Sequence, residues 1–169
     1  MSYLFCPRCG TSYTDQSRKA EYLHCLNCEF DFYQNPKPCN GLIIENSHGE
    51  ILLIKRKYAP DKGKWDVPGG FVDLQENLEQ SAIREAKEEL NAEIKDIHYL
   101  ASYSDTYDFQ SMTYPTLIFI LSASLTGSSI KASDDAEGIK FFPKNQIPWD
   151  NLAFNFLKPA LKDYLRQQK

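Results

Sequence analysis

The sequence predicts an α/β fold preceded by a small metal-binding unit. Two C-x2-C pairs lie within the first 28 residues, and short aliphatic runs typical of strands flank one long amphipathic helical pattern further along the chain. The chain has 169 residues, of which 42% are hydrophobic and 25% are charged, as in ordinary globular proteins. This composition fits one domain with a small appendage and excludes disordered and collagen-like architectures.

Charge and hydropathy narrow the classes of function. The net charge is −4, and residues 41–150 hold 18 acidic against 11 basic side chains. No stripe of lysine or arginine is present, so general nucleic-acid binding is disfavoured, and the concentration of acid indicates cations instead. No apolar run approaches the ~18 residues of a membrane span, and no apolar signal segment precedes Cys6. We therefore expect a soluble, cytoplasmic protein with no membrane partner.

The four cysteines near the N-terminus indicate a zinc site. Cys6 and Cys9 form one C-x2-C pair, Cys25 and Cys28 form the other, and fifteen residues separate the pairs. This spacing is typical of four thiolates around one tetrahedral ion. A pair of disulfides or a redox motif is the alternative, but two-residue loops close poorly as disulfides and a reducing compartment is expected. Cys39 stands outside this pattern and is expected to be a small buried residue at the start of a strand.

Residues 1–33 contain too little apolar material to fold without their metal, so we interpret them as a zinc ribbon. The segment Gln34-Asn-Pro-Lys-Pro38 follows, and its two prolines forbid helix and indicate an extended connection. This places the boundary near residue 36, between a zinc ribbon over residues 1–35 and a larger domain over residues 36–169.

The larger domain begins with a predicted β-hairpin. Two aliphatic runs, residues 41–45 and 51–55, are separated by turn residues 46–49. A polar loop and a glycine-rich turn follow. Residues 77–90 then repeat apolar residues at the i, i+4 spacing of an amphipathic helix, and Asn77 and Gln80 supply a capping box at its start.

Three carboxylates lie together on this predicted helix. At 100° per residue, Glu85, Glu88 and Glu89 share an arc of about 100°. A solvated polar face is the usual explanation of such a run. However, like charges placed in this way repel, and a hard divalent cation such as Mg²⁺ would compensate the repulsion. The glycine-rich turn upstream supplies backbone oxygens close to the same place.

These residues resemble the signature box of the Nudix hydrolases. Gly70 is followed after five residues by Glu76 and after seven more by Arg84-Glu-Ala-Lys-Glu-Glu-Leu90. The box normally ends in glycine where this chain has Asn91, and we expect asparagine to adopt the left-handed conformation that the position needs. A four-cysteine ribbon joined to such a domain is similar to the arrangement in the zinc-ribbon NADH pyrophosphatases. The resemblance implies a Nudix α/β/α sandwich with a mixed sheet.

The remaining elements fit this fold. Residues 94–104, 112–125 and 138–142 are expected to be further strands, and residues 151–167 a closing helix. Pro159 lies inside that last pattern and should kink the helix or split it into two pieces.

The resemblance also implies the chemistry of the site. Nudix enzymes cleave nucleoside diphosphates linked to another moiety by attack of water on phosphorus, with Mg²⁺ or Mn²⁺ holding the diphosphate. Carried over to this chain, Glu85 and Glu89 are the principal metal ligands and Glu88 is a further ligand. The carbonyl oxygen of Gly70 completes the set. An acidic site can bind a diphosphate only through such metal ions, which explains the acidic middle of the chain.

Supporting groups follow from the same resemblance. Arg84, which we place on the opposite side of the helix from the glutamates, is expected to hold them by ion pairing, and Glu76 is expected to steady the loop. Glu137 is the expected acceptor of a proton from the attacking water, with Asp135 next and an exposed acidic turn as the alternative. Tyr107 is expected to pack within a strand, with stacking on a base as the alternative.

Three functions are left by the sequence. A metal-dependent diphosphate hydrolase is favoured because the carboxylates and the arginine of the box are all present. A catalytically silent, nucleotide-sensing regulator is the alternative, and a module whose ribbon grips RNA or protein is the third. The resemblance implies a small nucleotide substrate, with ADP-ribose, NADH, diadenosine polyphosphates and nucleoside triphosphates in that order. It also allows a homodimer, because dimers are common in that family.

Overall fold

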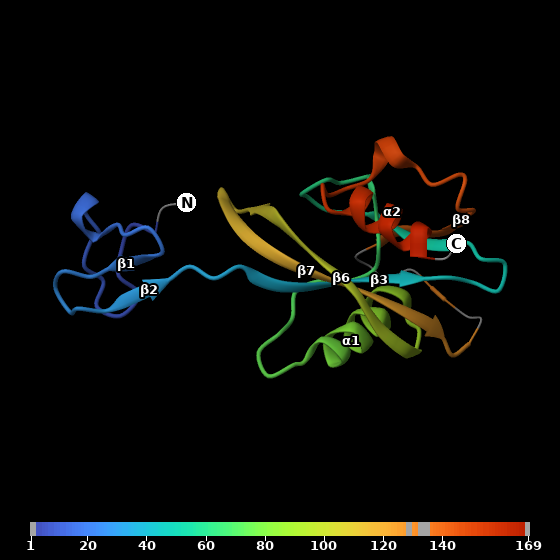
Figure 1. Cartoon of the computed structure of the whole chain (residues 1–169), viewed down its shortest axis with the longest axis horizontal. Helices are drawn as coiled ribbons and strands as arrows, with labels where there is room; N and C mark the ends of the chain where they lie inside the picture. Colours follow the sequence, from blue (N-terminus) through green and yellow to red (C-terminus); the bar gives the residue numbers. More distant parts are fainter. Residues whose placement is uncertain (1–2, 128–129, 132–135, 168–169) are drawn as a thin grey trace.

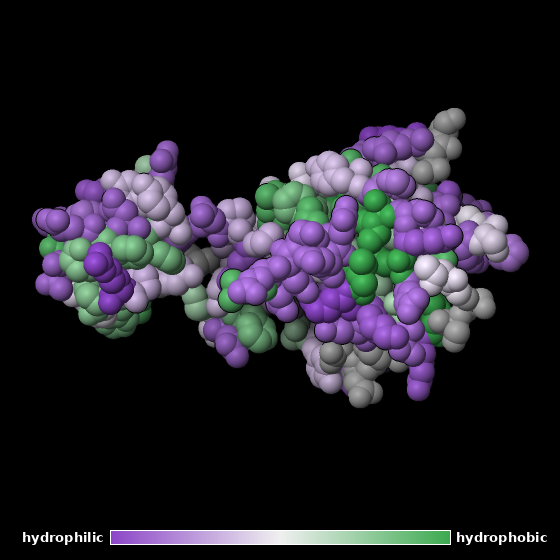
Figure 2. Space-filling view, turned by 90° about the horizontal axis from the view of Figure 1, so that it is seen from below, coloured by the Kyte–Doolittle hydropathy of each residue, from purple (hydrophilic) through white to green (hydrophobic). Residues whose placement is uncertain are grey.

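The computed structural model describes residues 3–127, 130–131 and 136–167. Figure 1 shows a small N-terminal unit at one end of the molecule and a larger α/β unit at the other, joined by a single extended segment. In Figure 2, a view from the side of helix α1 (Leu78–Leu90), the two units stay separated by a narrow connection. The segment with two prolines therefore lies where the chain passes from one unit to the other.

The small unit is built on one short hairpin. Strand β1 (Tyr22–His24) pairs antiparallel with β2 (Asp31–Tyr33), and a 3₁₀ turn, η1 (Asp15–Ser17), precedes them. Its buried hydrophobic residues are few, namely Cys6, Tyr13, Leu23 and Cys25. Two of these four are cysteines, so little of the core is hydrocarbon, which agrees with a fold that depends on metal.

The larger unit contains two three-stranded sheets. The first has the order β3 (Lys37–Ile44), β7 (Met112–Leu125), β6 (Ile94–Phe109), and the second β5 (Trp65–Asp66), β4 (Ile51–Arg56), β8 (Ala136–Phe142). Strand β3 runs parallel to β7, whereas the other pairs are antiparallel, so the first sheet is mixed. Helix α1 and helix α2 (Leu157–Gln167) cover opposite faces of the strands (Figure 1). This confirms the predicted α/β/α arrangement.

Each helix covers its own hydrophobic cluster. Successive side chains of a strand point to opposite faces, so Leu42 and Ile44 of β3 pack in the cluster beside α1, and Ile43 packs in the cluster beside α2. Residues 51–54 of β4 alternate in the same way. The near-continuous aliphatic runs in the sequence thus reflect strands that are buried on both faces.

The ends of several elements differ from the prediction. Strand β3 begins at Lys37 instead of residue 41 and includes Pro38, which it tolerates because β3 is an edge strand with β7 as its neighbour. The closing helix begins at Leu157, six residues later than predicted, after a separate 3₁₀ turn η2 (Trp149–Asn151). Pro159 therefore lies in the first turn of α2, where a backbone N–H needs no helical partner. The helix runs as one piece from Leu157 to Gln167, so the predicted split at Pro159 is wrong.

Strands β6 and β7 form a long hairpin whose tip faces the small unit in Figure 1. Phe109 pairs with Met112, and the two residues between them, Gln110 and Ser111, both have positive φ. Two residues of positive φ give a tight turn that follows the twist of the strands. The hairpin carries Tyr107 and Phe109 to one side of the glycine-rich loop. None of the helices in the described part of the chain is long and apolar enough to cross a membrane.

Candidate functional site

A glycine-rich loop lies alongside strand β3 and is hydrogen-bonded to it. The backbone N–H of Asn40 donates to the carbonyl oxygen of Gly70 at 2.8 Å, and the N–H of Leu42 donates to the Pro68 carbonyl at 2.7 Å. Gly69 has a φ of 143°, and a Cβ atom there would strike the backbone carbonyl of Asn40. The loop can lie against the strand only because position 69 has no side chain.

The two ends of helix α1 fix its register against this loop. The side chain of Asn77 accepts from the Gln80 N–H at 2.8 Å, and the Gln80 side chain accepts from the Asn77 N–H at 2.9 Å. Asn91 follows the helix with φ 48° and ψ 38°. Both the predicted capping box and the predicted left-handed asparagine are therefore confirmed.

Two of the predicted ligands, Glu85 and Glu89, pack against the loop. Glu85 is 8% exposed, and a Cβ atom on Gly70 would lie only 2.8 Å from its carboxyl carbon. Glu89 Oε2 accepts a hydrogen bond from the Gly69 N–H at 2.9 Å. Burial raises the pKa of Glu85, and it raises the pKa of Glu89 to about 8 although the Gly69 N–H favours the charged form. Both carboxylates thus lie where a nearby cation would stabilise their charge.

Arg84 joins the carboxylates of the site. Its guanidinium donates to Glu76 at 2.8 and 3.0 Å, to Glu85 at 2.8 Å and to Glu88 at 3.0 Å. It also donates to the carbonyl of Phe71 at 2.9 Å, which ties the helix to the loop. These hydrogen bonds lower the pKa of Glu76 and raise the pKa of Arg84 itself. Our expectation that Arg84 lies opposite the glutamates is wrong, because residues 84 and 88 are one turn apart and share a face.

The three helix glutamates do not converge on one point. Among the described residues, only the four cysteines place three or more ligand atoms within 4.8 Å of one another. Arg84 Nη1 contacts both Glu85 and Glu88, and Glu89 turns to the backbone of the loop. The carboxylates and the second lone pair of the Gly70 carbonyl are hard oxygen ligands of the kind that Mg²⁺ prefers. The donor set therefore fits a divalent cation that takes Arg84's place beside one or more of the carboxylates.

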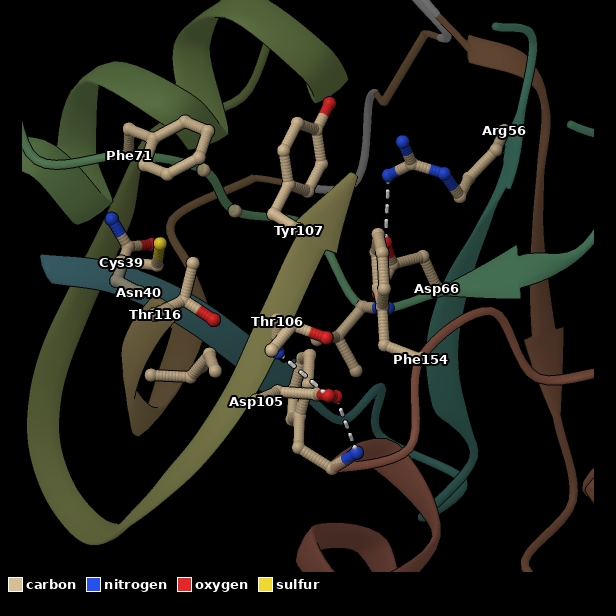
Figure 3. A pocket seen from close by; sticks show the side chains of 15 residues that line it. Cys39, Asn40, Arg56, Asp66, Phe71, Asp105, Thr106, Tyr107, Thr116 and Phe154 are labelled. Atoms are coloured by element: carbon tan, nitrogen blue, oxygen red, sulfur yellow. Dashed lines mark hydrogen bonds and ion pairs between the residues drawn. The ribbon is translucent and has the colours of Figure 1, made fainter. Parts of the chain in front are cut away.

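A cavity of about 150 Å³ opens beside the loop, and Figure 3 shows the side chains that line it. Phe71, Tyr107 and Phe154 supply aromatic walls, with the rings of Phe71 and Tyr107 packed edge to face at 5.3 Å. At one end the Arg56 guanidinium lies over the Phe154 ring at 4.7 Å and donates to Asp66 at 3.0 Å. Burial raises the pKa of Asp66 to about 6, against the effect of Arg56.

The floor of the cavity comes from the parallel pair β3 and β7. Asn40 and Thr116 are buried polar residues there, and Cys39 lies beside them. Cys39 lies at the start of strand β3, as predicted, but it is half-buried instead of buried. Asp105 accepts from the backbone N–H groups of Thr106 and Phe156, which holds the Phe154 segment against β6 (Figure 3).

A larger groove of about 730 Å³ lies on the other side of Phe71 and Tyr107, which line both hollows. It runs between loop residues 71–76 and the tip of the β6–β7 hairpin, and Lys37 lies over the Tyr114 ring in it. Tyr107 lies on β6 and its ring packs against Phe71 and Phe154, as strand packing predicts, and it also lines both hollows.

The predicted proton acceptor lies apart from this group. Glu137 is on β8, its side chain is half exposed, and it forms an ion pair with Lys55 at 3.3 Å. It does not line the cavity beside the loop. Asp135 lies outside the described residues.

The four cysteines of the small unit are arranged as a tetrahedral site requires. Cys6 and Cys28 sulfurs are 3.8 Å apart, and those of Cys9 and Cys25 are 3.5 Å apart. Four sulfurs at about 2.3 Å from a central zinc would lie about 3.8 Å from one another. A disulfide would place two sulfurs at about 2.05 Å. The cluster is consistent with a zinc ribbon, and it suggests a structural metal.

Comparison with known proteins decides the family. The model of the NUDIX domain matches residues 35–164 of this chain. The chain belongs to the Nudix family. An ADP-ribose pyrophosphatase of Methanocaldococcus jannaschii is 38% identical to it over 138 residues, which are 82% of this chain and 78% of that protein. This Nudix chain is also similar to the NAD-capped RNA hydrolase NudC of Haemophilus influenzae, at 35% identity over 104 residues.

That second match covers 60% of this chain and only 38% of the longer NudC protein. Among solved structures, a NUDIX hydrolase from Nitrosomonas europaea superimposes with a TM-score of 0.71 at 29% identity, covering 94% of this chain and 90% of that one. The chain is thus an enzyme of the Nudix pyrophosphohydrolase family, whose members typically depend on divalent metals.

Sequence reasoning missed several residues around the Nudix box. Asn40, Arg56, Asp66 and Phe154 come from four separate segments, and no spacing along the chain connects them. Arg56 carried the clearest signal, since it is a basic residue at the end of a buried strand. The others meet only because β3 pairs with β7 and the segment before α2 folds back over β6.

Proposed function

We propose that this Nudix enzyme hydrolyses the diphosphate linkage of a nucleoside diphosphate joined to another moiety, with ADP-ribose as the first candidate. The observation that carries the proposal is a pair of carboxylates, the buried Glu85 and the part-buried Glu89, packed against a glycine loop beside an aromatic-lined cavity. Hard oxygen ligands next to a cavity with aromatic walls suit a phosphate group that is attached to a nucleobase. The similarity to an ADP-ribose pyrophosphatase supports the choice of first substrate.

The metal ligands in this proposal are Glu85, Glu89, Glu88 and the carbonyl oxygen of Gly70, with Mg²⁺ or Mn²⁺ as the ion. The fit rests on the absent side chain at position 70, since a Cβ atom there would fill the space beside the Glu85 carboxylate. Glu88 has a side chain that is 59% exposed, so it can swing toward an arriving ion. When bound, a divalent cation would neutralise phosphate charge and make the phosphorus more open to attack.

The chain's own residues prepare the reaction. Arg84 holds Glu85 and Glu88 from one side, and Glu76 holds Arg84 in turn, so the carboxylates keep their places in the absence of substrate. Water attacks phosphorus, the bond to the bridging oxygen breaks, and a nucleoside monophosphate and a second phosphate compound leave. We assign acceptance of the water's proton to Glu137, which must first leave its ion pair with Lys55 to reach the attacking water.

The small unit has a supporting role in this proposal. Cys6, Cys9, Cys25 and Cys28 would hold one zinc ion, which takes the place of a hydrocarbon core in residues 1–35. Residues 36–169 would then form the hydrolase domain. The silent, nucleotide-sensing regulator is not favoured, because the carboxylates of the box and their arginine are all in place.

The test is hydrolysis of a panel of nucleoside-diphosphate derivatives with Mg²⁺ or Mn²⁺, using the natural protein, Glu89→Gln and Glu79→Gln. Glu79 is an exposed carboxylate in the first turn of the same helix, so Glu79→Gln is the matched control. We expect metal-dependent release of a nucleoside monophosphate that falls at least 100-fold in Glu89→Gln only, because that variant removes a metal ligand. No turnover of any compound, with nucleotide binding that Glu89→Gln leaves unchanged, would refute the hydrolase.

A further inference from the structure

One buried hydroxyl group in the small N-terminal unit is left without a partner. Tyr13 is 9% exposed and packs in the cluster that contains Cys6 and Cys25. Its hydroxyl oxygen is buried and makes no hydrogen bond of ordinary geometry among the described residues. Buried hydroxyl groups almost always have a partner, so this one points to an interaction with the groups that surround it.

The pairing of the chain places this side chain beside a metal ligand. Phe5 forms an antiparallel bridge with Ser12, and the backbone N–H of Cys6 donates to the Thr11 carbonyl at 2.8 Å. Successive side chains of paired segments point to opposite faces. Cys6 and Tyr13 each lie one residue from the bridge, so both point to the face opposite that of the bridged residues. The tyrosine and the cysteine are therefore neighbours on one face.

The electrostatics of the pair agree with this placement. Burial raises the pKa of Tyr13 to about 12, and the next cause is the interaction of its hydroxyl with the Cys6 sulfur. The charges of Cys6, Cys25 and Cys28 raise the pKa further. A tyrosine that keeps its proton is a hydrogen-bond donor, and a thiolate is an acceptor. The hydroxyl of Tyr13 thus faces an acceptor of the right kind.

A zinc ion held by four thiolates needs donors of this kind. Four thiolates and one Zn²⁺ sum to a net charge of about −2, which is costly to bury unless hydrogen bonds stabilise it. The Cys9 sulfur lies 3.4 Å from the Thr11 hydroxyl and 3.7 Å from the Asn27 amide nitrogen. Cys6 is only 2% exposed, so water has little access to its sulfur. Two backbone N–H groups of the turn after Cys6 act on that sulfur, and Tyr13 adds a side-chain donor.

We propose that the Tyr13 hydroxyl donates a hydrogen bond to the zinc-bound sulfur of Cys6 and thereby strengthens zinc binding. The inference rests on the zinc site of the proposed function. Zinc binds the thiolate and not the thiol, so a donor that stabilises the thiolate favours the form that the metal needs. Tyr13 is then a positioning residue of the zinc site, and its hydroxyl does more than fill the core of the small unit.

The test uses the full chain loaded with Zn²⁺ or with Co²⁺, because thiolates bound to Co²⁺ give an absorption band through transfer of charge from sulfur to metal. Tyr13→Phe removes only the hydroxyl. Tyr33→Phe is the matched control, since Tyr33 belongs to the same unit and is 54% exposed. In Tyr13→Phe we expect the band to move to longer wavelength, because a sulfur that has lost a donor gives up charge more easily. Zinc affinity, measured by competition with a chelator, should fall about 10- to 100-fold in Tyr13→Phe and stay unchanged in Tyr33→Phe.

Two results would overturn the role of Tyr13 while leaving the zinc site in place. One is an unshifted band in Tyr13→Phe, and the other is a zinc affinity within threefold of that of the natural protein. Tighter zinc binding by the variant would overturn it as well, because that is the effect of removing a buried hydroxyl that has no partner. Natural protein whose thiolates bind neither Zn²⁺ nor Co²⁺ would overturn the zinc site itself and the role of Tyr13 with it.

Discussion

Replacement of Gly70 by alanine tests the metal site with a single methyl group. Gly70 does not have a positive φ, so alanine is compatible with its backbone. Its Cβ atom would nevertheless lie 2.8 Å from the carboxyl carbon of Glu85 and 3.1 Å from Oε2. The methyl group and the carboxylate cannot both keep their present positions.

The size of the displacement sets the expected effect. Ordinary contact begins at 3.4 Å, so the Glu85 carboxyl carbon must retreat by about 0.6 Å, and Oε1, the atom nearest to the added Cβ, must move further. Metal–ligand distances tolerate only about 0.2 Å, and disturbing the support of a metal ligand typically costs 10- to 100-fold in affinity or activity. Overpacking by one methyl group costs about 1–3 kcal/mol of folding free energy, which a domain stable by about 5–15 kcal/mol survives. Gly70→Ala should therefore fold but bind its metal poorly.

The assay is a titration with Mn²⁺ followed by electron paramagnetic resonance, which measures bound metal without any substrate. We expect the apparent affinity to fall about 10- to 100-fold in Gly70→Ala. Gly138→Ala is the matched control, because its φ is not positive and no described atom lies within 4 Å of the added Cβ. If folded Gly70→Ala binds Mn²⁺ within threefold of the natural protein, the ion does not lie between Gly70 and Glu85.

Three further outcomes follow from other contacts. Arg84→Met should lower the free energy of unfolding, measured in urea, by about 3 kcal/mol, because it leaves part-buried carboxylates unpaired. Arg166→Met, at an exposed ion pair, should change that free energy by less than about 0.5 kcal/mol. Equal effects of the two variants would contradict the reasoning. Atomic absorption should find one zinc ion per chain in the natural protein. Cys28→Ser should lose this zinc and Cys39→Ser should keep it, and natural protein without zinc would disprove the site. Because burial raises the pKa of Asp66 from 3.8 to about 6, the native state keeps a proton that the unfolded chain has lost, so this group lowers stability as pH rises toward 6. The total is about 3 kcal/mol, and urea titrations from pH 3.5 to 7 should show a flatter profile for Asp66→Asn; parallel profiles would refute the assignment.

Local patterns predicted the fold well wherever one segment carries its own signal. Helix α1 begins and ends where its capping box and Asn91 place it, and the buried strands follow the aliphatic runs. The closing helix was harder, because residues 151–156 continue its apolar pattern but form a turn and a connection. Asp105 explains this, since it accepts the Phe156 N–H and holds that segment on strand β6. A contact between residues 51 positions apart leaves no trace in the local sequence.

The functional site also has a part that the local sequence predicts and a part that it does not. The carboxylates of the box lie on one helix, so their positions relative to one another follow from helical geometry. The cavity beside them is assembled from β3, β6, the loop and the segment before α2, and its residues share no period. A prediction from one sequence can therefore name the carboxylates of the box but not the residues that line the cavity, because the former are local and the latter depend on how distant strands pair.

The structure corrects the sequence prediction for Arg84, although this residue lies on the same helix as the carboxylates. Its position one turn before Glu88 lets one guanidinium bridge the carboxylates of Glu85 and Glu88, and without it these two like charges would repel each other. Glu85 and Glu88 would hold a divalent cation through these same oxygens, and Glu76 would still bind the Arg84 guanidinium. Arg84 thus acts as a counter-ion that stabilises these carboxylates when no metal is bound. This explains how acidic groups can stay packed against the glycine loop before any ion arrives.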